Sequence, residues 1–102
     1  MRTLMKIVMG TEAGSRAFRD GTLQKTIMNV SEMIKPEAAY FLPENGKRTA
    51  YFFFDLQDSS LLPQISEQLF QDFNAEVYVT PCMNQEDLQK GLQNVTSGKK
   101  NK

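Results

Sequence analysis

The chain has 102 residues, 40% of them hydrophobic and 24% charged, and its 12 basic residues balance 12 acidic ones, a composition that predicts one globular domain. Its one cysteine, Cys82, and its lack of histidine exclude an intrachain disulfide and a zinc site built from cysteine and histidine, and no cofactor is expected. No apolar run approaches the roughly 20 residues of a membrane span and the N-terminus does not resemble a signal peptide, so we expect a cytoplasmic protein without membrane contact.

The first third of the chain predicts a strand followed by a helix. Residues 2–9, "RTLMKIVM", combine apolar and β-branched residues as strands do. The stretch that follows, up to Lys35, predicts a helix that Pro36 stops. Gly21 within it costs about 1 kcal/mol relative to alanine, so the helix is expected to begin late. Its apolar residues recur at spacings of four, three and four, on one helical face: Leu23, Ile27, Val30 and Ile34.

The rest of the chain predicts two further strands, a helix and a last strand. Residues 37–42 and 48–56 form a hairpin around the turn 43–47, where Asn45 and Gly46 supply positive φ angles. Residues 58–60 can cap a helix that Pro63 begins, and residues 75–80 alternate as a fourth strand. A short helix is expected from about Gln85. The second long helix is marked by an apolar stripe: Leu62, Ile65, Leu69 and Phe73.

This order of elements predicts an α+β fold. With right-handed crossovers, the order βαββαβ gives a ferredoxin-like sandwich. Two helices then lie on one face of a four-stranded antiparallel sheet whose first and third strands are central. We expect this domain to span residues 1–92 and a disordered polar tail to follow over residues 93–102.

Strand alternation sorts the side chains onto two faces of the sheet. One face is wholly apolar and is the expected bed for the helices: Met5, Ile7, Met9, Ala39, Phe41, Phe52, Phe54, Val77 and Val79. The opposite face, here called the mixed face, carries aromatic and aliphatic residues among charges: Leu4, Lys6, Val8, Tyr40, Tyr51, Phe53, Asp55, Glu76, Tyr78 and Thr80. Apolar clusters of this size mark interfaces or pockets. We therefore expect a homodimer in which a second copy packs its own sheet there.

Part of the chain resembles a known superfamily. The βαββαβ order, the third strand "YFFFDL" and the ending "AEVYVTPCMNQEDL" are similar to the dimeric α/β-barrel superfamily, over roughly residues 2–92. The likeness is to short uncharacterised members near the muconolactone-isomerase and antibiotic-biosynthesis-monooxygenase groups. The resemblance implies dimerisation through the sheets and a ligand cavity between sheet and helices or near the dimer seam. Because the chain lacks histidine and tryptophan, no catalytic set carries over.

The mixed face also holds the candidate ligand-binding residues. Lys6 lies in mid-strand, and Asp55 and Glu76 come from the two neighbouring strands. This arrangement would orient a polar ligand or shift a pKa for proton transfer, or else form a salt bridge that fixes register at an interface. The tyrosines at 40, 51 and 78 would line a pocket or pack across the interface. The candidate site is therefore Lys6, Tyr40, Tyr51, Asp55, Glu76 and Tyr78.

Three functions remain open from the sequence. The first is a homodimer that binds a small apolar or aromatic ligand without catalysis. The second is a cofactor-independent isomerase or monooxygenase acting on a small aromatic or lactone-like compound. The third is an RNA binder, because "KRTAYFFF" at 47–54 partly matches the third-strand signature of RNA-recognition motifs. Without the three lysines of the last four residues, nine basic residues face twelve acidic ones, and we expect no nucleic-acid partner.

Overall fold

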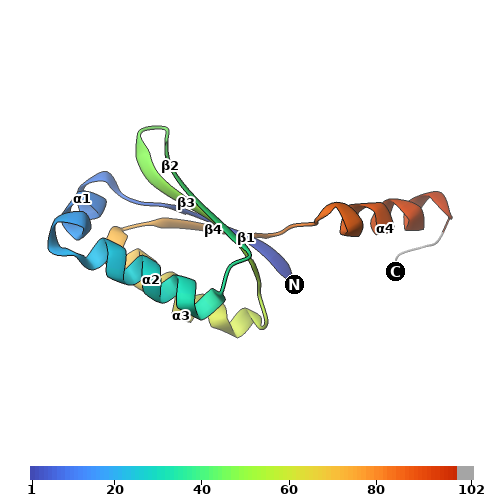
Figure 1. Ribbon diagram of the computed structural model, residues 1–102, viewed down its shortest axis with the longest axis horizontal. Helices are drawn as coiled ribbons and strands as arrows, with labels where there is room; N and C mark the ends of the chain where they lie inside the picture. The colour runs from blue at the N-terminus through green and yellow to red at the C-terminus, as the bar shows by residue number, and fades with distance from the viewer. Residues whose placement is uncertain (99–102) are drawn as a thin grey trace.

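The computed structural model describes residues 1–98, which form a sheet, three helices packed on it and a fourth helix that projects away (Figure 1). The fold is α+β and compatible with the predicted ferredoxin-like class. The elements in chain order are β1 (Arg2–Val8), α1 (Thr11–Asp20), α2 (Thr22–Ile34), β2 (Ala38–Glu44), β3 (Lys47–Asp55), η1 (Ser59–Leu61), α3 (Leu62–Phe73), β4 (Glu76–Pro81) and α4 (Gln85–Thr96).

The four strands form one sheet in the order β2-β3-β1-β4, and every neighbouring pair is antiparallel. The central position of β1 and β3 is as predicted. Met5 lies opposite Phe52 of β3 and Val79 of β4, and this register places the side chains of the three residues on the face toward the helices. The two central strands therefore supply the floor of the core.

The β2–β3 hairpin turns on two residues. Asn45 and Gly46 have φ angles of 54° and 78°, the pair of positive values that a two-residue type I′ turn requires. The predicted turn is thus confirmed. Because this turn matches the twist of the strands, the ladder continues directly up to it, with Glu44 opposite Lys47.

The segment between β1 and β2 holds two helices, and the prediction of one helix that begins late was wrong. Gly21 adopts a left-handed conformation with φ 84°, which ends α1 and begins α2. The first helix escaped the apolar pattern because its buried residues are small: Ala13, Gly14 and Ala17. Three helices rather than two therefore pack on the sheet (Figure 1).

The core lies between the sheet and these helices. Phe52, Phe54 and Phe73 are fully or almost fully buried there, and the predicted stripe of α3 points inward as Ile65, Leu69 and Phe73. Two members of the predicted apolar face are more exposed, Phe41 at 58% and Val79 at 37%. Both belong to edge strands, β2 and β4, which the helices cover incompletely.

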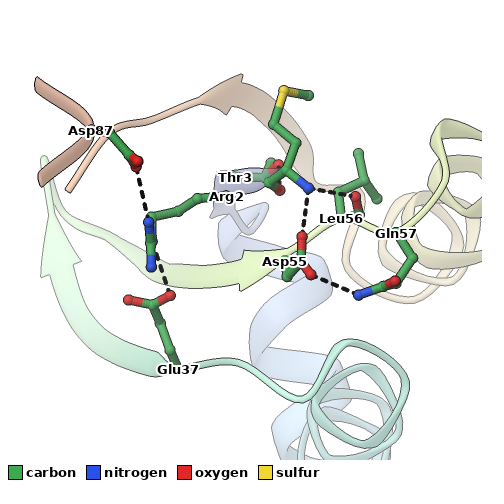
Figure 2. Close-up of polar contacts among 8 residues, drawn as sticks. Arg2, Thr3, Glu37, Asp55, Leu56, Gln57 and Asp87 are labelled. Carbon is green, nitrogen blue, oxygen red and sulfur yellow. Dashed lines mark hydrogen bonds and ion pairs between the residues drawn. The ribbon is translucent and has the colours of Figure 1, made fainter. Parts of the chain in front are cut away.

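The last helix, α4, projects away from the rest of the molecule (Figure 1), and the molecule measures 56 × 29 × 20 Å. It begins at a capping box in which Asn84 and Asp87 satisfy each other's backbone N–H groups. No residue of α4 is buried. Its anchor to the sheet is the ion pair of Arg2 Nη1 with Asp87 Oδ2 at 3.0 Å (Figure 2).

The helix α4 begins where the sequence predicts a short helix, but it extends to Thr96. Residues 93–96 of the predicted disordered tail are therefore helical. Residues 97–98 of that tail form a turn, and residues 99–102 lie outside the described residues. No helix of the described part of the chain is both long and apolar enough to cross a membrane.

Candidate functional site

A row of four side chains crosses the mixed face at the middle of the sheet. Tyr40, Tyr51, Lys6 and Tyr78 lie on β2, β3, β1 and β4 in direct register. Tyr40 and Tyr78 are 61% and 52% exposed, while the two central members are half-buried. The structure thus brings together four of the six predicted site residues.

The ammonium group of Lys6 lies between two aromatic rings and one carboxylate. Its Nζ is 5.7 Å from the ring centroid of Tyr51 and 5.9 Å from that of Tyr78. It donates a hydrogen bond to Glu44 Oε2 at 2.9 Å. These contacts satisfy a half-buried cation by charge pairing and by cation–π attraction.

The expected pairing of Lys6 with Asp55 and Glu76 was wrong, and the register explains why. Lys6 faces Tyr51, whereas Asp55 faces Arg2 at the far end of the ladder. Glu76 faces Val8 rather than Lys6. The carboxylate that reaches Lys6 is Glu44, a residue of the predicted turn 43–47.

Glu44 joins Lys6 and Tyr51 into one polar cluster. The hydroxyl of Tyr51 donates to Glu44 Oε1 while Lys6 donates to the other oxygen. The hydrogen bond from Tyr51, and then that from Lys6, lowers the pKa of Glu44 below its usual value. The hydrogen bond with Glu44 raises the pKa of Lys6 and also that of Tyr51. At neutral pH this cluster is a charged lysine, an ionised glutamate and a neutral phenol.

The remaining two predicted residues serve other contacts. Asp55 accepts hydrogen bonds from the amino group of Met1 and from Gln57 Nε2, at the opposite end of β3 from the cluster (Figure 2). The bond from that amino group lowers the pKa of Asp55. Glu76 accepts from the Tyr78 hydroxyl, which raises the pKa of Tyr78.

A polar hollow of about 550 Å³ opens on the mixed face beside the row. Lys6, Glu76 and Tyr78 line it, together with Glu44 and other residues near the hairpin turn. Charged groups of both signs therefore face this hollow, and the carboxylates there disfavour a phosphate backbone.

A second depression, here called the apolar groove, lies on the other side of the sheet and measures about 570 Å³. Side chains of the two helices α1 and α2 form one wall and the overhanging edge of β2 forms the other. Phe18 and Phe41, at 66% and 58% exposed, stand in it without a covering element. The remaining apolar lining includes Met9, Leu23, Ile27 and Pro43.

None of the six predicted site residues lines the apolar groove. Strand alternation predicts Phe41 on the helix-covered face, and no sequence pattern singles out Phe18. The sequence signal for this groove is the position of Phe41 on a predicted edge strand, because the two predicted helices are too few to cover all four strands.

Comparison with known proteins adds no family: no protein-family model matches the chain, and no curated protein matches it. Within residues 1–98, no group of three or more histidine, cysteine, aspartate or glutamate side chains could hold a metal ion.

Proposed function

We propose that the protein is a homodimer of the dimeric α/β-barrel type that binds a small apolar or aromatic ligand without catalysing its conversion. The observation that carries the ligand half of this proposal is the apolar groove. Two phenylalanines exposed by more than half in one hollow leave apolar surface that water solvates poorly. The volume of about 570 Å³ lies within the range typical of small-molecule sites.

The surroundings of Lys6 disfavour its use as a general base. A general base must lose its proton near the working pH, but the hydrogen bond with Glu44 raises the pKa of Lys6. The alternative of an isomerase or monooxygenase that uses Lys6 as a base therefore gains no support.

The ligand proposal is tested with 1-octanol as the probe. The ¹⁵N-labelled protein is titrated with 1-octanol, and backbone chemical shifts locate and quantify binding. We expect the shifts to concentrate on residues of the apolar groove. If 1-octanol shifts no resonance of the groove, the ligand proposal is contradicted.

Phe41→Ala is the matched perturbation. The ligand would cover about half of this ring, which is worth about 1 kcal/mol, so the affinity for 1-octanol should fall about five-fold. Phe70→Ala is the control, because Phe70 is also exposed, at 41%, but lies on α3 and does not line the groove. An equal loss of 1-octanol affinity in both variants would show that Phe41 acts only through the stability of the fold and not by contacting the ligand.

The mixed face supports the dimer half of the proposal. Four strands about 4.8 Å apart and about seven residues long give a face roughly 19 Å by 24 Å. Its flat outline is about 450 Å², and side chains make its accessible area larger than that outline, of the same order as the roughly 800 Å² that a standard interface buries on each partner. The sheet alone would therefore make an interface near the small end of the standard range.

The helix α4 offers further area. It is about 18 Å long by its rise, and Leu88, Leu92 and Val95 share one face at spacings of four and three. These three side chains are 44%, 52% and 66% exposed. An amphipathic helix of this kind needs an apolar partner, and a second copy supplies one next to the sheet. The formal charge of zero adds no net repulsion between copies.

A further inference from the structure

The rim of the apolar groove carries a positively charged side chain whose position is set by the fold. Arg48 is the only charged residue that lines the groove within the described part of the chain. It lies at the start of β3, opposite Pro43, on the face toward the helices. Its backbone carbonyl accepts a hydrogen bond from Met9 N at 2.9 Å, which ties this end of β3 to the end of β1.

The guanidinium group of Arg48 is also held by α1. Its Nη1 donates to Ser15 Oγ at 3.2 Å. Gly14 leaves room for it, because a Cβ atom at position 14 would lie only 3.2 Å from Nη1. This single contact biases the exposed arginine toward the end of the groove near α1, which reduces the entropy lost on binding.

This cation has no carboxylate partner among residues 1–98. Within these residues, ion pairs with glutamate or aspartate are formed by Arg2, by Lys6 and by the amino group of Met1. A guanidinium group has five N–H donors in a planar fork that matches a carboxylate, and Ser15 uses one of them. The remaining donors are available beside an apolar surface.

We propose that the ligand of the apolar groove is an amphipathic carboxylic acid, with its carboxylate on Arg48 and its hydrocarbon or aryl part against Phe18 and Phe41. This inference rests on the proposed function and names the chemical class of that same site. A carboxylate can accept two parallel hydrogen bonds from arginine. A neutral apolar compound would leave the guanidinium unpaired.

The test compares octanoate with 1-octanol, which share a hydrocarbon chain and differ in charge. Both are titrated into ¹⁵N-labelled wild-type protein and into Arg48→Gln. We expect the wild type to bind octanoate about ten- to hundred-fold more tightly than 1-octanol, as charge-assisted hydrogen bonds predict. Arg48→Gln should remove that preference, so that octanoate and 1-octanol bind with similar affinity.

Two further variants sharpen the result. Arg48→Lys keeps the charge but loses the planar fork, so it should bind octanoate more weakly than wild type and more tightly than Arg48→Gln. Arg19→Gln removes a cation that does not line the groove, and it should retain the wild-type preference for octanoate. The spectra of all variants report in the same experiment that each is folded.

The possible failures are distinct. If wild type binds octanoate no more tightly than 1-octanol, or if Arg48→Gln weakens both equally, the carboxylate inference is overturned while the apolar site stands. If neither compound shifts the resonances of the groove, the proposed function and this inference both fail.

Discussion

The substitution Leu92→Gln isolates the role of α4 in the proposed dimer. Leucine and glutamine have similar helix propensities, so α4 should remain helical. No residue of α4 is buried within the chain itself. The change should therefore leave the fold of the monomer intact and act on association alone.

The size of the effect follows from exposure. Leu92 keeps 52% of its surface exposed, and burying this exposed half of a leucine is worth about 0.8–1.5 kcal/mol. In a two-fold dimer each substitution occurs twice, so the loss is about 1.5–3 kcal/mol per dimer. The dimer dissociation constant should rise about 10- to 100-fold.

Sedimentation equilibrium measures that constant against the chain mass of 11.6 kDa. Lys90→Gln is the control, because it introduces the same residue on the opposite face of α4 and should leave the constant close to that of wild type. If Leu92→Gln dimerises as wild type does, α4 lies outside the interface and the proposal that it enlarges the interface is wrong.

Two other predictions concern the ionised Glu44 and the turn residue Gly46. The hydrogen bonds from Tyr51 and Lys6 lower the pKa of Glu44, so the folded state gains stability above the ordinary carboxyl pKa and loses it as the pH falls through the lowered value. The free energy of unfolding should therefore change less steeply with pH on the acid side in Glu44→Gln than in wild type, and an unchanged slope would contradict this. Gly46→Ala forces alanine to φ 78° in open space, which should cost about 1 kcal/mol of stability and lower Tm by about 4–8 °C. Gly91→Ala, on a helix with open space around it, should not lower Tm. Equal decreases in Tm for both variants, measured by calorimetry, would show that the positive φ angle is not the cause.

Local signals predicted most of the fold. The Asn45-Gly46 pair determines its own turn through positive φ angles, and the stripe ending in Phe73 identifies α3 without tertiary information. Gly21 shows the limit of such signals. Its propensity cost was visible in the sequence, but that cost does not tell whether the glycine lies inside one helix or takes the left-handed conformation that ends one helix and begins another.

The candidate site was harder to predict because it depends on register and coverage. Lys6 reaches across β3 to Glu44 on β2, and a contact between next-nearest strands cannot be inferred from strand neighbours alone. Pro43 and the turn signal that follows it also predict that Glu44 lies in a loop, whereas it is the last residue of β2. The apolar groove exists because the edge strand β2 extends beyond the helices at Phe41. The alternation of residues within a strand predicts which face a side chain lies on, but it does not predict how far the helices cover that face.

The proposed cover of the mixed face is tested most directly by tyrosine fluorescence. The chain has three tyrosines and no tryptophan, and all three tyrosines lie in the row across this face, so their emission reports on that surface alone. Acrylamide quenching is measured over a dilution series that spans the association constant found by sedimentation. The account predicts that the quenching constant falls severalfold as dimers form, because a second copy covers Tyr40 and Tyr78. A quenching constant that stays high while sedimentation detects dimers would contradict it.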